Sequence, residues 1–260
     1  MKWRVIVLAA GRGPSDPMAA AHGVSHKCLV EIAGIPMLRR VVDTLAGHPS
    51  ISTISVAIDD RAVGREALGD AVSKVEFVPT AESAARTVCA LLSRSDGDYP
   101  ILLTTADHPL LTAPMIDSFI AGSTAAPADL TVGLASAETI LTAYPDARRT
   151  FLRFGNDRVS GCNLFGLRTA EAIKAVEFWH YLEPLRKKPW RLFAAFGTKA
   201  ILEFFTGKIN LQRAFAVASQ RLGIVARPVL LPFADAAVDV DKPVDKDLAE
   251  LILRKRAAHQ

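Results

Sequence analysis

The sequence predicts an α/β protein, a three-layer α/β/α sandwich with a mostly parallel sheet. Over residues 1–135, short apolar segments alternate with longer amphipathic ones, the pattern of parallel strands joined by helical crossovers. Half of the 260 residues are hydrophobic and 22% are charged, which allows a large buried core. No repeat or low-complexity linker divides the chain, so we expect a single domain over residues 1–260.

The elements of the first half follow from strand-forming residues and from helix starts. Val, Ile and Leu dominate the short segments, and Pro36 and Pro114 stand at predicted first helical turns, where proline loses no hydrogen bond. Strands are predicted at Arg4–Ala9, Ile54–Ile58, Val75–Val78, Ile101–Thr104 and Leu130–Leu134, and helices at Pro36–Leu45, Asp60–Ala71, Glu82–Ser93 and Ala113–Ala121.

The pattern changes after residue 150. A turn at Gly155-Asn156-Asp157 predicts two flanking strands, Thr150–Phe154 and Asn163–Leu167. A further strand is expected at Ile224–Leu231, and a last helix at Pro243–Arg254. Between them, residues 174–221 are predicted to form an insertion of two or three amphipathic helices, broken at Pro184, Pro189 and Gly207.

The insertion at 174–221 is basic and aromatic. It holds nine Lys and Arg against three Glu, a net charge of +6, and nine of the 18 aromatic residues. Three interpretations fit this composition: a helical cap that buries its aromatics on the sheet, a homodimer interface, or a basic surface that contacts an anionic membrane. The segment at 183–191 fits the membrane interpretation best.

Composition also limits the setting of the protein. No apolar run reaches the roughly 18 residues that span a bilayer. The three cysteines, Cys28, Cys89 and Cys162, are far apart and show no metal-binding spacing. We therefore expect a cytoplasmic protein whose cysteines lie in the core, with a peripheral location at the membrane as an alternative. We expect no nucleic-acid partner.

The most informative stretch follows the first strand. It ends in small residues and a glycine turn, a shape whose free N–H groups can cradle phosphate, and Arg12 adds a forked cation. A P-loop would need Gly-Lys-Ser/Thr, but Lys27 is followed by Cys28; a dinucleotide fingerprint would need a third glycine where Asp16 stands. The expected phosphate-binding residues are Leu8, Ala9, Ala10, Gly11, Arg12 and Gly13.

Three further blocks follow in the chain. Lys27 begins an apolar stretch that ends in Gly34-Ile35-Pro36-Met37. A hydrophobic strand ends in Asp107, followed by His108 and Pro-Leu-Leu, and Val238–Asp245 reads Val-Asp-Val-Asp-Lys-Pro-Val-Asp. Together with the glycine turn, these blocks resemble those of the MobA-like NTP transferases, nucleotidyltransferases with a GT-A-like fold.

This resemblance implies an activity and a set of site residues. In that family the glycine loop wraps the triphosphate of an NTP, a lysine matched by Lys27 contacts the phosphates, and two aspartates coordinate Mg²⁺. Asp107 matches the first aspartate, and Asp241 matches the second, with Asp239 as the next choice. Arg12, Lys27 and Asp107 are then the catalytic residues. The base-reading segment falls at 79–88, where Ser83 and Thr87 could meet ribose or base.

The expected acceptor contacts are less specific. Relatives often carry an Asn near a glycine where Asn163 stands, although a turn asparagine is an equal alternative. Arg149 and Arg153 could bind an acceptor phosphate or belong to a solvated basic face. Asp107 and Asp241 could also be helix caps, and His108 a plain loop histidine. The chain departs from the family in a long gap between Gly13 and Lys27 and in His26, where relatives often have Pro.

The predicted reaction is transfer of an NMP, from CTP or GTP, to a phosphorylated small-molecule acceptor, with release of pyrophosphate and with Mg²⁺ as cofactor. Two alternatives stay open: a nucleotide-sugar-dependent glycosyltransferase and a non-catalytic NTP-binding regulatory protein. The usual metal motif of such glycosyltransferases, Asp-x-Asp, is absent at the mid-chain strand, since Thr105-Ala106 precedes Asp107.

Overall fold

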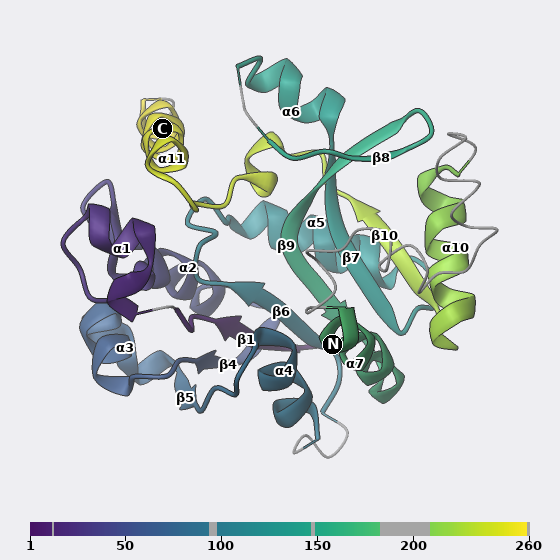
Figure 1. The fold of residues 1–260 in the computed structure, drawn as a ribbon, viewed down its shortest axis with the longest axis horizontal. Coiled ribbons are helices and arrows are strands. Elements are labelled where there is room, and N and C mark those ends of the chain that lie inside the picture. The colour runs from purple at the N-terminus through teal and green to yellow at the C-terminus, as the bar shows by residue number, and fades with distance from the viewer. Residues whose placement is uncertain (12, 94–97, 147–148, 183–208, 259–260) are drawn as a thin grey trace.

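The computed structural model describes residues 1–11, 13–93, 98–146, 149–182 and 209–258. It confirms the predicted class, because a central sheet of eight strands carries helices on both faces (Figure 1). The strands lie in the order β10-β7-β9-β6-β1-β4-β5, and β8 pairs with β9 outside this path. Their bounds are β1 Trp3–Leu8, β4 Ile51–Ala57, β5 Glu76–Val78, β6 Ile101–Thr105, β7 Leu130–Ser136, β8 Leu152–Phe154, β9 Asp157–Leu167 and β10 Ala226–Leu230.

Most neighbouring strands are parallel. β1 is parallel to both β4 and β6, β4 is parallel to β5, and β7 is parallel to β10. β9 is antiparallel to its three partners, β6, β7 and β8. Because β6 and β7 both oppose β9, they point the same way. The carboxyl ends of β1, β4, β6, β7 and β10 therefore share one edge of the sheet, where ligands bind in open α/β sheets.

Both faces of the sheet are buried, which explains why its central strands are mainly apolar. Val5 and Val7 of β1 face one core cluster, and Ile6 between them faces another. The first face is covered by α2 (Met37–Ala46), α3 (Arg61–Leu68) and α5 (Ala113–Thr124), and the second by α4 (Ala84–Leu92) and α7 (Ile173–Leu182). The remaining α-helices of the described residues are α1 (Pro17–Ala21), α6 (Ala137–Ala143), α10 (Leu211–Leu222) and α11 (Pro243–Ala257).

The predicted elements are present, with corrected ends. The helix predicted over Asp60–Ala71 ends at Leu68 because Gly69 adopts a positive φ of 55°, and a 3₁₀ turn follows to Lys74. β9 begins at Asp157 rather than at Asn163. The sequence patterns missed the short α1 and α6 and a small hairpin of β2 (Glu31–Ile32) and β3 (Ile35–Pro36).

The insertion at 174–221 is described only at its two ends. α7 buries Val176 in the cluster on the α4 face, and α10 buries Leu211 near β7. Trp179 and Tyr181 of α7 are exposed. The predicted breaks at Pro184, Pro189 and Gly207 lie outside the described residues. No helix within the described ranges is long and apolar enough to cross a membrane.

Gly166 marks the tightest approach between β9 and its neighbours. A Cβ there would overlap the Thr131 hydroxyl and lie 3.3 Å from the indole of the fully buried Trp3. The Thr131 hydroxyl is itself held 2.8 Å from Ser123 Oγ, so it has little freedom to move. We predict that Gly166→Ala lowers the free energy of unfolding by about 1–3 kcal/mol, the usual cost of overpacking a core.

Urea unfolding of the purified chain measures this effect. Gly161→Ala, on the same strand, is the matched control, because a Cβ there would meet no atom within 4 Å. Equal unfolding free energies for the two variants would contradict the packing argument.

Candidate active site

The glycine turn leaves β1 at the carboxyl edge of the sheet. Ala9 N donates to Ala57 O over 2.9 Å, and Ala106 N donates to Leu8 O over the same distance, so the start of the turn is tied to both neighbouring strands. Gly13 has a φ of 58°, a conformation that glycine adopts without strain. Arg12 lies outside the described residues. The predicted phosphate loop therefore begins where β1, β4 and β6 end.

The ammonium group of Lys27 bridges two carboxylates. Its Nζ lies 2.7 Å from Asp107 Oδ2 and 2.5 Å from Asp241 Oδ1. The lysine side chain is 17% exposed. Burial alone lowers the pKa of Lys27, but the two carboxylates outweigh it and leave that pKa above its ordinary value. The structure thus joins three residues that the sequence separates by 80 and 214 positions.

Asp107 follows the end of β6 and is held by the C-terminal segment. Its backbone carbonyl accepts a hydrogen bond of 3.0 Å from Val240 N. Its Oδ1 is buried without a hydrogen-bond partner among the described residues, although Oδ2 contacts Lys27. The neighbouring His108 is fully buried, and burial lowers its pKa to about 4, so its imidazole is neutral at neutral pH. His108 is a core residue beside the site.

In the C-terminal segment Val238–Asp241, buried valines alternate with aspartates that point away from the core. Val238 and Val240 are buried in a cluster with Met18 of α1 and Ile252 of α11, so successive side chains alternate between this core and the opposite side. α1 and α11, from opposite ends of the chain, lie on the same side of the molecule (Figure 1). Asp245 then fixes the backbone, because its Oδ2 accepts from the N–H groups of Asp241 and Lys242.

Arg149, which the sequence offered as a contact for the acceptor substrate, binds residues of the C-terminal segment. Its guanidinium donates to the Asp239 carboxylate and to the carbonyl of Ala237, and it lies 3.7 Å from Asp245. Arg149, one of the expected acceptor contacts, is therefore engaged by an ion pair inside the protein, and Asp239 is paired with it and not with Lys27. Burial raises the pKa of Asp239, and the charges of Asp241 and Asp107 raise it further, while Arg149 opposes them.

The other two acceptor candidates differ. Arg153 is exposed on β8, opposite Arg158, and has no ion pair with any residue the structure describes. Asn163 is half-buried and has a φ of 51°, which asparagine tolerates better than most residues. It belongs to a bulge: Val132 pairs with Phe165 and Leu134 with Gly161, so β9 carries extra residues there. Such bulges re-aim side chains near active sites.

The position of Asn163 follows from register. The last paired residues of β6 and β9 are Leu103 and Phe165, and the bulge begins immediately beyond them. Asn163 therefore lies beside the carboxyl end of β6, next to the turn that carries Asp107. The structure thus places one of the three acceptor candidates at the edge shared by the Lys27 cluster.

The segment expected to read the base has mixed roles. Ser83 caps α4 by accepting from Arg86 N over 3.3 Å and remains half-exposed. Thr87 is 2% exposed; its hydroxyl accepts from Ala81 N at 2.8 Å and donates to Ser83 O at 2.9 Å. The Thr87 hydroxyl thus holds the loop that precedes α4 from within.

The sequence patterns did not predict the contact between His26 and Asp59, which lies beside the glycine turn. His26 Nε2 lies 3.7 Å from Asp59 Oδ2, and its Nδ1 lies 3.1 Å from Ser25 Oγ. The same Nε2 is 4.0 Å from where a Cβ of Gly13 would stand. The only signal for this contact was His26 itself, in a position where relatives often have Pro.

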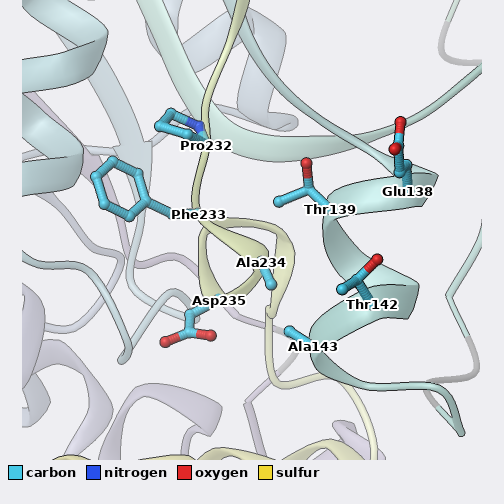
Figure 2. A pocket seen from close by; sticks show the side chains of 8 residues that line it. All are labelled: Glu138, Thr139, Thr142, Ala143, Pro232, Phe233, Ala234 and Asp235. Atoms are coloured by element: carbon cyan, nitrogen blue, oxygen red, sulfur yellow. The ribbon is translucent and has the colours of Figure 1, made fainter.

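A pocket of about 560 Å³ opens elsewhere on the molecule, between α6 and residues 232–235 (Figure 2). Thr139 and Thr142 of α6 lie across from Ala234, whereas Asp235 turns away from α6 and bonds Tyr144 and Arg256. None of the predicted nucleotide-binding residues lines it.

Asp107 and Asp241 form a donor set that fits Mg²⁺. Both offer hard carboxylate oxygens, and the buried, unpartnered Oδ1 of Asp107 is free to coordinate. Within the described ranges, no group of three or more His, Cys, Asp or Glu could hold a metal ion. A pair suits Mg²⁺, which takes the rest of its shell from waters and phosphate oxygens.

Comparison with known proteins agrees with this geometry. The model of the MobA-like NTP transferase domain matches residues 5–153, more than half of the chain. No curated protein sequence matches significantly. A structure described as a hypothetical transferase from Thermus thermophilus is 26% identical, with a TM-score of 0.78, and the match covers 95% of this chain and 100% of that one.

Two structures of lower identity share the fold. A CMP:2-keto-3-deoxy-manno-octonic acid synthetase complexed with CTP is 14% identical, with a TM-score of 0.62 and coverage of 98% and 100%. The 4-diphosphocytidyl-2C-methyl-D-erythritol synthase from Anaerococcus prevotii is 13% identical, with a TM-score of 0.57 and coverage of 97% and 96%.

The contacts of Arg149 with Asp239, Ala237 and Asp245, here called the Arg149 clamp, predict that replacing Arg149 lowers the stability of the fold. Arg149→Met leaves the Asp239 carboxylate half-buried without its counter-charge, which costs about 1–3 kcal/mol of unfolding free energy. Urea unfolding measures it. The double variant Arg149→Met/Asp239→Asn regains part of the loss, and the control Arg153→Met stays within about 0.5 kcal/mol of the parent. Parent-like unfolding of Arg149→Met would contradict the clamp.

Proposed function

We propose, from the premise that this chain belongs to the MobA-like NTP transferase family, that it transfers an NMP from an NTP to a phosphorylated small-molecule acceptor and releases pyrophosphate. One observation carries this proposal: Lys27, Asp107 and Asp241 converge at the edge where the glycine turn leaves β1. A cation and two hard carboxylates beside a phosphate-sized turn are what a triphosphate and its metal need.

The glycine turn and two cations would hold the triphosphate. Backbone N–H groups near Gly11 and Gly13 would face phosphate oxygens, and Arg12 would add a bidentate contact. The Lys27 ammonium, on a flexible stem, would turn from the carboxylates to the β- and γ-phosphates. These contacts stabilise the charge that develops on the leaving pyrophosphate, so they act most strongly in the transition state.

Asp107 and Asp241 would hold Mg²⁺. When bound, Mg²⁺ neutralises charge on the phosphoryl oxygens. The two aspartates would fix its place, since one follows the end of β6 and the other lies on the tightly held C-terminal segment. The unpartnered Oδ1 of Asp107 supports this role.

Asn163 would orient the acceptor. Its amide can both donate and accept hydrogen bonds, and the bulge puts it beside the end of β6. An acceptor phosphate is already ionised at neutral pH, so its oxygen can attack the α-phosphorus in line without a strong protein base. The buried, neutral His108 agrees with a reaction that relies on positioning and charge neutralisation.

CTP and GTP are the proposed donors. Both low-identity structures named above carry CTP or a cytidyl group in their names, and their likeness to this chain is one of fold. CTP is therefore the first nucleotide to test.

Pyrophosphate release tests the proposal. The purified chain is given Mg²⁺, each of CTP, GTP, ATP and UTP, and a panel of sugar phosphates as acceptors. We predict release with one preferred nucleotide and a loss of at least about 100-fold in kcat for Asp107→Asn, typical of removing a key electrostatic group. Asp98→Asn keeps parent activity, because the one ion pair of Asp98 with a described residue is the exposed contact with Arg4 at the opposite edge of the sheet.

Other outcomes point to other functions. Release of a nucleoside mono- or diphosphate from a nucleotide sugar would identify a glycosyltransferase, and nucleotide binding with no product would identify a regulatory protein. Parent-like activity of a folded Asp107→Asn variant would refute the assignment of Asp107.

A further inference from the structure

Lys27 occupies the place that a divalent cation would take between Asp107 and Asp241. We propose that the two cations compete for this pair of carboxylates, so that the metal binds as part of a metal–nucleotide complex and not to the free protein. This inference rests on the proposed function and adds an order to it: the phosphates must draw Lys27 away before Asp107 and Asp241 can hold the metal together.

The distances exclude an ammonium and a metal ion together in the position between Asp107 Oδ2 and Asp241 Oδ1. Nζ of Lys27 lies 2.7 Å and 2.5 Å from one oxygen of each carboxylate, the space a bridging ion would fill. Mg²⁺ binds oxygen at roughly 2.0–2.1 Å and needs near-octahedral geometry, so it cannot enter while the ammonium remains.

The charges of the cluster make the ammonium a stable occupant. Lys27 is only 17% exposed, and without a counter-ion Asp107 and Asp241 would repel one another. The third carboxylate, Asp239, takes its counter-charge from Arg149 and so does not compete for Lys27. With nucleotide absent, the ammonium therefore offsets one of the two negative charges and occupies the position between the carboxylates that a metal would take.

The exchange needs only side-chain movement. The backbone of Lys27 is fixed by a hydrogen bond from Val30 N to its carbonyl, 3.1 Å long. The residue before it, His26, lies against Gly13 of the turn. The Lys27 side chain has four rotatable bonds, so its ammonium group can move between the carboxylates and a triphosphate held by that turn. Once it swings, Asp107 offers both Oδ2 and the unpartnered Oδ1 to a metal.

The test measures Mn²⁺ binding to the full chain by the electron paramagnetic resonance signal of free Mn²⁺, first without nucleotide. We expect Lys27→Met to bind Mn²⁺ about tenfold more tightly than the parent, a coupling of ordinary size for linked sites. Lys74→Met is the matched control, because Lys74 Nζ contacts the surface carboxylate of Asp43 at 3.0 Å. It binds Mn²⁺ like the parent. Adding Asp107→Asn to Lys27→Met abolishes the gain.

The second measurement repeats Mn²⁺ binding with saturating CTP or GTP, which should reduce the difference in affinity between the parent and Lys27→Met by drawing the Lys27 ammonium of the parent onto the phosphates. We expect the parent to bind Mn²⁺ far more tightly with nucleotide than without, and Lys27→Met to show a smaller gain, since it has no ammonium to displace. Thermal unfolding checks that each variant folds, and Lys27→Gln replaces Lys27→Met if the latter does not.

Equal Mn²⁺ affinity of the nucleotide-free parent and of a folded Lys27 variant would overturn the competition. That result would leave the proposed function standing, because pyrophosphate release by the parent is measured separately. Conversely, failure of the parent to release pyrophosphate with any nucleotide refutes the proposed function, whichever way the nucleotide-free Mn²⁺ comparison turns out.

Discussion

The contact of one ammonium with two carboxylates organises this end of the molecule. Lys27 follows the phosphate turn, Asp107 follows β6, and Asp241 precedes the last helix, so the contact closes three distant parts of the chain onto one sheet edge. Partly buried ion pairs contribute little net stability, since desolvation offsets most of the attraction. The contact matters more for geometry, because it holds one cation and two carboxylates together at the edge of the sheet where we propose that the nucleotide binds.

Packing below the cluster sets its precision. Val238 and Val240 anchor the C-terminal segment in a core shared with Met18 and Ile252, and the Arg149 clamp holds Asp239 on the other side. Because Val238 and Val240 point into the core, the side chain of Asp241 points the other way, toward Lys27. A site built on such supports needs little rearrangement when ligand arrives, which is the usual basis of electrostatic catalysis.

The glycine turn, Lys27, Asp107 and Asp241 could be proposed from the sequence because each lies in a local pattern: a strand end, a lysine block, or an Asp-Val-Asp run before Pro243. The structure adds that Lys27 contacts both aspartates. The partner of Arg149 could not be predicted, since only the folded chain brings position 239 beside it. The hydrogen bonds of the Thr87 hydroxyl could not be predicted either, because no sequence pattern specifies the loop backbone that it contacts. The bulge at Asn163 appears only in the register of β7 against β9.

A crystal structure of the chain with Mn²⁺ and a non-hydrolysable CTP analogue, with the metal located by anomalous scattering, tests the central claim most directly. We predict Mn²⁺ bonded to Asp107 and Asp241 and to a phosphate oxygen, with Lys27 Nζ moved onto the β- or γ-phosphate. Mn²⁺ bound away from both aspartates, with Lys27 still bridging them while the nucleotide occupies the glycine turn, would contradict it.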